Sequence, residues 1–446
     1  MPPSAKKAEI YIGVVISVAI FLILSQAIVS LVFSAYDLVV FTQSRTTARY
    51  LAEEKIETAR NISFDELGTV GGIPTGILPQ TESVTRNGVI YTVTNRVDNI
   101  DDPYDGQGAS DTSPVDYKKV QITVSWGGAG TLSRANRINL VTDISDDRDQ
   151  DTDGGTLDIT VSDSQGVPVS LASVTIVSSG ITPAVNVTLT TDQDGKLEIP
   201  GATPCTSCYQ ISTTKTGYST DRTYGTSEVT NPTNPHVSVI ENQVSSLDLS
   251  IDLLGTLTIH SVNGRDQGFT ALGNQQFILR GEKIIGTDSG GTLIYKYANV
   301  VSTNSSGELT VNNLEWDAYH IQIPTGVGWD ISGANPLLPI ILSPGQTQSV
   351  TFAAVTGSTH RLLVTFQNGS LTPIASVSAI LKENTNQEAT SSSGLEGNPD
   401  FGQSFFGNLS QKTYTLYATA SGYLDYTNTD VVVNDYTQQN VILIEQ

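Results

Sequence analysis

An acidic run near residue 150 carries the clearest metal-binding pattern in the chain. The pattern is D-x-D-x-D-G, the first half of a calcium loop, in which alternating carboxylates coordinate the ion and the glycine allows the turn. Its residues are Asp149, Asp151, Asp153 and Gly154, with Asp158 a candidate additional ligand. The closing glutamate of such a loop is missing, because Thr160 stands in its place. A solvated linker is therefore the favoured interpretation, and calcium is the alternative.

The two cysteines, Cys205 and Cys208, lie in one CTSC tetrapeptide. A redox-active C-x-x-C sits at a helix N-terminus beside a parallel sheet, whereas this one follows Pro204 in a loop before a predicted strand. Outside the cytoplasm the pair is compatible with a structural disulfide, which is favoured over free thiols. Zinc would need two further ligands, for which His236 is the one candidate.

Residues suited to catalysis are scarce, since the chain has one methionine and four histidines. His260, His320 and His360 fall inside predicted strands at scattered registers, as surface histidines do. The sequence contains no G-x-S-x-G, phosphate loop or dinucleotide fingerprint, and its paired carboxylates lie in loops. Trp316, Trp329 and the Tyr-rich strands could form a platform that stacks on sugar rings, although Tyr and Trp are more often core or edge residues of a β-sandwich. We expect a protein that is not an enzyme.

The element that leads the chain is a long apolar helix. No charged residue occurs between Ile10 and Tyr36, which is long enough to span the ~30 Å hydrocarbon core of a bilayer. A cleavable signal peptide would have an apolar region of only ~7–15 residues, so an uncleaved anchor is favoured. Lys6 and Lys7 precede the run, and the positive-inside rule then leaves the N-terminus in the cytoplasm. We expect a single-pass membrane protein with its C-terminal domains at the cell surface.

The helical pattern continues beyond the apolar run to the end of segment 1–61. Small and apolar residues recur there at three- and four-residue spacing, which places them on one helix face: Ala48, Leu51, Ala52, Ile56 and Ala59. Two interpretations stay open for this stripe. It packs on the protein's own next domain, or it also contacts neighbouring subunits in a filament.

Segment 62–146 shows the period-2 alternation of half-buried antiparallel strands, as in Val120, Ile122 and Val124. The order of a long apolar helix, the sequence ARYLAEEKIETARNISFDEL, and a short sheet resembles minor-pilin-like proteins of type IV filaments. The resemblance implies a long helix capped by a β-sheet head, and other pilin-like subunits as partners. The processing site departs from the family, because Ser4 stands where glycine is expected. Glu9 either neutralises a neighbouring subunit during filament assembly or is an ordinary interfacial charge.

After an acidic linker at 147–155, the chain repeats itself three times with a period near 100 residues, over 156–254, 255–356 and 357–446. Each unit opens with an alternating strand, crosses a Gly-centred turn and continues through a Tyr-led strand, a pattern typical of β-sandwiches. The units resemble carboxypeptidase regulatory-like and collagen-adhesin B-type domains. That resemblance implies transthyretin-like sandwiches used as stalks or adhesive modules. The opening strands lack the lysine that an internal isopeptide bond would need.

Composition agrees with this plan. The chain has 446 residues, a net charge of −22 and a pI of about 4.4, so a nucleic-acid backbone would repel it. The sequence predicts a mainly β protein: an N-terminal helix, a pilin-like head and three sandwiches. The predicted function is filament assembly or adhesion from a membrane anchor. The alternative is an anchored stalk outside any filament that binds a cell-surface glycan or protein; a secreted hydrolase is disfavoured.

Overall fold

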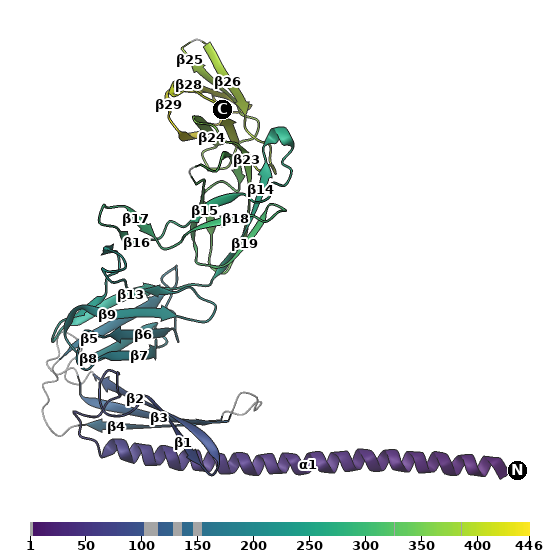
Figure 1. Ribbon diagram of the computed structural model, residues 1–446, viewed down its shortest axis with the longest axis vertical. Helices are drawn as coiled ribbons and strands as arrows, with labels where there is room; N and C mark the ends of the chain where they lie inside the picture. The colour runs from purple at the N-terminus through teal and green to yellow at the C-terminus, as the bar shows by residue number, and fades with distance from the viewer. Residues whose placement is uncertain (1–2, 102–114, 128–135, 146–153, 325, 385) are drawn as a thin grey trace.

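A computed structural model describes residues 3–101, 115–127, 136–145, 154–324, 326–384 and 386–446, and the side chains from residue 17 onward. One long helix runs along the base, a small sheet lies on its C-terminal half, and three sandwiches rise away from it (Figure 1). The predicted fold class, mainly β behind one long N-terminal apolar helix, is confirmed.

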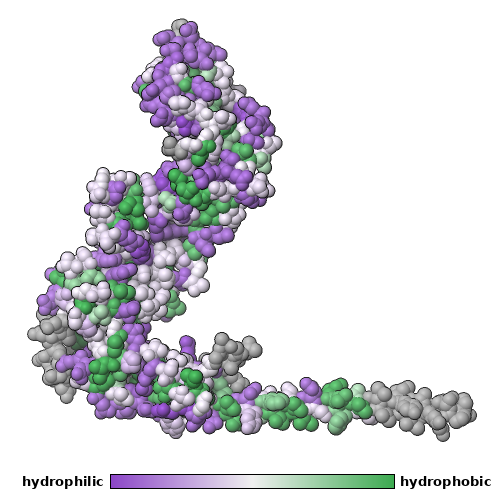
Figure 2. Space-filling view, viewed as in Figure 1, coloured by the Kyte–Doolittle hydropathy of each residue, from purple (hydrophilic) through white to green (hydrophobic). Residues whose placement is uncertain are grey.

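Helix α1 spans Pro3–Arg60. Its 58 residues extend for about 87 Å at 1.5 Å per residue. Between Ser17 and Val40 almost every described side chain is exposed, including Phe21 and Leu31 at 68% and 70%. The segment Ser17–Arg60 contains a stretch of mean hydropathy 2.4, none of it buried in the protein, which by length and composition could cross a membrane. This bare apolar stretch projects beyond the head (Figure 2).

The remaining part of α1 packs on the head. The head is one antiparallel sheet in the order β1-β2-β3-β4, made of β1 (Thr81–Arg86), β2 (Val89–Ile100), β3 (Tyr117–Trp126) and β4 (Arg137–Ser145). The alanines of the helix stripe, Ala48, Ala52 and Ala59, are fully buried against this sheet, because their small side chains let the backbones approach closely. The stripe therefore packs on the protein's own head, as the first interpretation predicted.

The first sandwich has two sheets. One has the order β13-β5-β8, from β5 (Gly155–Ser162), β8 (Lys196–Ala202) and β13 (Val244–Ser250). The other has the order β10-β9-β6-β7, with β12 also paired to β9, from β6 (Ser173–Ser178), β7 (Val185–Thr190), β9 (Cys205–Thr214), β10 (Asp221–Arg222) and β12 (Val237–Val239). Alternate residues of these strands form one buried core.

The second sandwich has the orders β19-β14-β23-β21 and β18-β15-β20-β22. Its strands are β14 (Gly255–Asn263), β15 (Gln276–Arg280), β18 (Ala298–Ser302), β19 (Glu308–Leu314), β20 (Asp317–Gln322), β21 (Trp329–Asn335), β22 (Ile340–Leu342) and β23 (Thr347–Thr356). A short 3-10 helix, Arg265–Gln267, follows β14. The hairpin of β16 (Ile284–Thr287) and β17 (Leu293–Tyr295) pairs with β11 (Asn231–Pro232) of the first sandwich.

The third sandwich has the orders β27-β24-β30 and β26-β25-β28-β29. Its strands are β24 (Arg361–Gln367), β25 (Ser378–Glu383), β26 (Asn386–Ser392), β27 (Gln403–Phe406), β28 (Lys412–Thr419), β29 (Tyr426–Val433) and β30 (Tyr436–Ile442). Its core is drawn from residues of this unit alone.

Each sandwich joins its opening strand to its closing strand in parallel: β5 with β13, β14 with β23, and β24 with β30. Because the first and last strands run in the same direction, each unit begins at one pole and ends at the opposite pole. This pairing explains why the units stack end to end.

The Gly-centred turns have one recurring geometry. In the 304–308 turn the Asn304 side chain accepts hydrogen bonds from the backbone N–H groups of Ser306 and Glu308, at 2.8 and 3.0 Å. The glycine of the turn, Gly307, has a φ of +78°, which other residues adopt with strain. Asp192 accepts the same pair of bonds in the 192–196 turn.

Neighbouring units are joined by non-covalent contacts of side chains and backbone groups, in addition to the covalent linkers between them. Ile73, from the head, is buried in the core of the first sandwich, and the neighbouring Gly71 carbonyl accepts a hydrogen bond from Asn186 N at 2.6 Å. The second and third sandwiches meet through Gln403, whose amide exchanges two hydrogen bonds with the backbone of Ala334, at 3.1 and 2.8 Å. The stalk is continuous from helix to tip.

Candidate functional site

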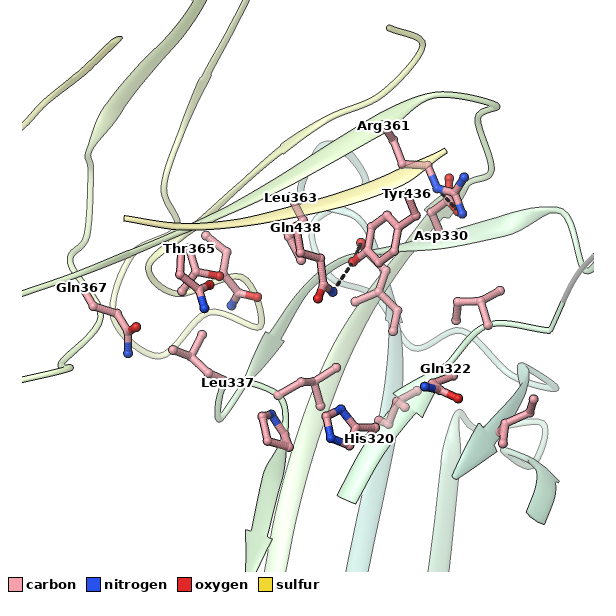
Figure 3. A pocket seen from close by; sticks show the side chains of 18 of the residues that line it. His320, Gln322, Asp330, Leu337, Arg361, Leu363, Thr365, Gln367, Tyr436 and Gln438 are labelled. Carbon is pink, nitrogen blue, oxygen red and sulfur yellow. Dashed lines mark hydrogen bonds and ion pairs between the residues drawn. The ribbon is translucent and has the colours of Figure 1, made fainter. Parts of the chain in front are cut away.

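A cleft with a volume of about 1150 Å³ lies between the second and third sandwiches. One wall is the outer face of β15, β20 and β22. The other is the outer face of β24 and β30, and the segment 337–339 closes one side (Figure 3).

Strand alternation sets the lining of the upper wall. In β24, Leu362, Val364 and Phe366 point into the core of the third sandwich and are fully buried. The residues between them, Leu363, Thr365 and Gln367, therefore face the cleft. The same period of two brings Tyr436, Gln438 and Asn440 of β30 into the lining.

The opposite wall follows the same rule. In β20, Tyr319 and Ile321 are buried, so His320 and Gln322 face the cleft. Ile341 of β22 does so as well and is 64% exposed. His320 Nε2 lies 2.7 Å from Glu282 Oε1, and this pair lies at the surface.

One end of the cleft is closed by an ion pair. Arg361 Nε lies 2.6 Å from Asp330 Oδ1, and the Asp330 side chain is 3% exposed. The other carboxylate oxygen of Asp330 accepts a hydrogen bond from Ser358 N at 2.8 Å. Burial raises the pKa of Tyr436, beside this pair, to about 12, so its phenol stays protonated near neutral pH.

The joint behind the cleft is tightly fixed. Two nitrogens of Arg265, Nε and Nη2, lie 2.8 and 2.6 Å from Asp400 Oδ2, and Nη1 donates to the Ser392 carbonyl at 2.9 Å. Gly333 lies against Asp400 so closely that a Cβ on the glycine would be 2.6 Å from Cα of Asp400. These contacts hold the two walls of the cleft in place without a ligand.

The predicted disulfide residues lie elsewhere, in the first sandwich. Cys205 and Cys208 are joined by a disulfide at the start of β9, where Cys205 pairs with Val239 of β12. Ser178 Oγ donates to Cys208 Sγ at 3.2 Å. The bond lies at a strand start in a sheet, a position that fits a structural role.

Of the predicted calcium ligands, Asp149, Asp151 and Asp153 lie outside the described residues. Asp158 lies on β5 opposite Glu198 of β8. The pKa of Glu198 is raised, first by burial and then by the negative charges of Asp158 and Asp101. Among the described residues no group of three or more His, Cys, Asp or Glu is arranged to hold a metal ion. The side chain of Glu9 also lies outside the described part.

The predicted surface histidines have separate partners. His260 Nδ1 lies 3.8 Å from Glu308 Oε1, and His320 pairs with Glu282 as above. His360 lies just before β24 rather than inside a strand, and it bonds the carbonyl of Asn434. His236, the candidate zinc ligand, has its Nδ1 2.9 Å from the hydroxyl of Thr223.

The two tryptophans considered for sugar stacking are engaged within the protein. Trp329 stacks on Phe352 with ring centroids 5.5 Å apart and planes 10° apart. The ammonium of Lys283 lies 3.1 Å from the ring centroid of Trp316. Neither indole ring is a bare platform, so these two tryptophans do not support sugar stacking.

Sequence reasoning missed the cleft. One wall of the cleft could have been predicted from polar residues at outward positions of β24 and β30, namely Thr365, Gln367, Gln438 and Asn440. The opposite wall comes from another unit, and alternation does not say which two outer faces will meet.

Comparisons with known proteins give only distant likenesses. No family model and no curated protein matches the chain. Among solved structures it is similar to the Bacillus anthracis TIE protein, at 13% identity over 82% of this chain and 73% of that one, with a TM-score of 0.18. It is also similar to a streptococcal ancillary pilin, at 13% identity over 66% of this chain and 99% of the other, with a TM-score of 0.18. BcpA, the major pilin subunit of Bacillus cereus, matches at 12% identity over 66% and 100% of the two chains, again with a TM-score of 0.18. TM-scores of this size do not establish a shared overall arrangement, and the resemblances to type IV pilins and to carboxypeptidase regulatory-like domains remain predictions.

Proposed function

We propose that this chain is a membrane-anchored surface stalk that displays tandem β-sandwich modules for adhesion, without catalysis. The observation that carries the proposal is the bare apolar part of α1, continuous with the part that is buried under the head. Exposure of an apolar helix surface of this size to water would be strongly unfavourable, whereas its insertion into the hydrocarbon core of a bilayer is favourable.

The parallel pairing of first and last strands supports the display role. Tension between the anchor and the tip would enter each unit at one pole and leave at the other. It would load the β5–β13 and β14–β23 ladders along their length, so their hydrogen bonds would resist together. A stalk that holds a cell to a surface needs this property.

The topology in this proposal has the short N-terminus in the cytoplasm and residues 62–446 outside. Protease added to intact cells should then remove the sandwiches and leave a membrane-bound stub. Full protection of 62–446 on intact cells, with digestion after lysis, would refute the topology.

Entry into a filament is the finer proposal, and it rests on the pilin-like order of helix and head. The helix stripe considered for contacts with neighbouring subunits is covered by the head, so helix–helix contacts in a filament would have to use the bare apolar part of α1. Shearing cells and probing the released filaments for this chain tests it. If the protein never leaves the membrane fraction, the lone-stalk alternative holds.

Glu9 provides the variant for that assay, because an unpaired carboxylate in lipid is costly unless a neighbour supplies a partner. We expect Glu9→Ala to leave membrane insertion intact and to lower recovery in sheared filaments. If wild type is recovered there and the variant matches it, Glu9 is an interfacial charge only.

A further inference from the structure

We propose that the cleft between the second and third sandwiches binds an uncharged oligosaccharide. The inference deepens the adhesive function proposed above by naming a ligand class and the residues that would hold it. The volume of the cleft, about 1150 Å³, exceeds that of a typical small-molecule pocket, ~300–1,000 Å³, and suits several linked sugar rings.

The chemistry of the lining matches hydroxyl groups. The polar side chains on the walls are mainly amides and hydroxyls: Gln322, Thr365, Gln367, Gln438 and Asn440. An amide carries a donor and an acceptor side by side, as adjacent hydroxyls of a sugar require. Gln367 already donates to the Leu371 carbonyl at 2.6 Å and Gln322 faces the guanidinium of Arg280, so Gln438 and Asn440 are the principal candidates. Gln438 donates one hydrogen bond to the Tyr436 hydroxyl at 3.1 Å, which orients its amide, so that the carbonyl oxygen can accept (Figure 3).

Apolar residues from other elements share the lining with these amides. Ile341 and Leu371, 64% and 61% exposed, and Leu337 lie along the cleft. These apolar side chains can pack against the C–H faces of sugar rings, while the amides hydrogen-bond the hydroxyl groups at the ring edges.

The charged or titratable side chains of the lining, Arg361, Asp330 and His320, are all paired, which disfavours an ionic ligand. Arg361 is paired with Asp330, and that carboxylate is bonded on both oxygens. A cation would find no unpaired carboxylate on these walls, and an anion would be repelled by a chain of net charge −22.

The walls also disfavour an extended peptide. Peptides that add to a sheet use the backbone groups of a free strand edge. The central strand of each wall has its backbone engaged on both sides: β24 by β27 and β30, and β20 by β15 and β22. The central strands therefore offer only side chains, and on these walls an edge that a peptide could extend exists only on β30 and β22, which end their sheets.

The test uses the full chain purified in lauryldimethylamine oxide, a detergent without a sugar head group. Maltohexaose, cellohexaose, laminarihexaose and mannohexaose serve as probes in saturation-transfer NMR and calorimetry. We expect at least one hexaose to bind. The double variant Gln438→Ala with Asn440→Ala should weaken this binding about tenfold, because two hydrogen bonds to the sugar are lost.

The matched control removes two amides from the exterior of the opposite sheet, Asn386→Ala with Gln387→Ala, and should leave affinity within about twofold. A second variant, Thr365→Lys, places a charged side chain in the cleft and should abolish binding without touching the core.

Three results would overturn the inference. The first is no binding by any hexaose, and the second is binding that the cleft and control variants weaken equally. The third is enrichment of phage-displayed peptides on the wild-type protein, an enrichment that disappears with Thr365→Lys, while none of the hexaoses binds. Because the assay uses purified protein, such a failure is distinct from failure of the stalk topology, which is tested on intact cells.

Discussion

The substitution Arg265→Met tests whether the joint between the second and third sandwiches is a fixed contact. Asp400, the partner of this arginine, has a side chain that is only 8% exposed, and its Oδ1 has no partner among the described atoms. Removing the guanidinium would leave a buried carboxylate uncompensated. Losing one partner of a fully buried pair costs about 3–5 kcal/mol.

The expected loss is smaller here, because the Arg265 side chain is 40% exposed and water can partly replace it. We expect about 2–3 kcal/mol. For a cooperative unit of the second and third sandwiches that lowers Tm by about 5–10 °C. Calorimetry of the full chain in detergent should show the shift in one transition, while the others stay in place.

Two further variants make the result interpretable. Arg49→Met removes an arginine from an ion pair with Glu53 whose side chains are 70% and 45% exposed, and should cost no more than about 0.5 kcal/mol. Asp400→Asn added to Arg265→Met removes the stranded charge and should recover part of the lost stability. If Arg265→Met unfolds like Arg49→Met, the joint is not a stabilising contact and this reasoning is wrong.

Three other perturbations probe the head and the first sandwich. Ile73→Ala removes a side chain that the head buries in the first sandwich, and should lower that unit's free energy of unfolding by about 2–3 kcal/mol in denaturant titration. Cys205→Ser with Cys208→Ser opens a four-residue loop and should cost about 2 kcal/mol, and dithiothreitol should then destabilise wild type but not the variant. Glu198 has a pKa raised above 4.5 in the folded protein, so its contribution favours folding at low pH and is lost as the pH rises through the raised value. Glu198→Gln should therefore raise Tm at pH 7, and the difference should vanish below pH 4.5, as thermal scans at several pH values would show.

Much of the fold could be predicted because the local patterns were strong. The run from Ile10 to Tyr36 is long and uncharged, which predicts an apolar helix. In the strands of the repeats, the alternation of apolar and polar residues shows which side chains face the core and which face solvent. The Gly-centred turns formed as expected, since an Asx residue such as Asn304 and a glycine in the left-handed region specify the turn locally.

The features that depend on distant partners could not be predicted. The pairing of β11 with β16 joins residues more than 50 positions apart, and neither strand is long enough to show a period. The cleft needs the outer faces of two different units to meet, which depends on contacts such as Arg265 with Asp400. These contacts are set by the angle between sandwiches, and no local pattern records that angle.

The central claim is that α1 anchors an external stalk, and single-cysteine labelling on intact cells tests it most directly. Because the two native cysteines are joined in a disulfide, an introduced cysteine is the one thiol that the maleimide can label. A membrane-impermeant maleimide should label Ser421→Cys, an exposed position between β28 and β29 of the third sandwich, on intact cells, and Ser4→Cys only after permeabilisation. Labelling of Ser4→Cys on intact cells with protection of Ser421→Cys would contradict the account.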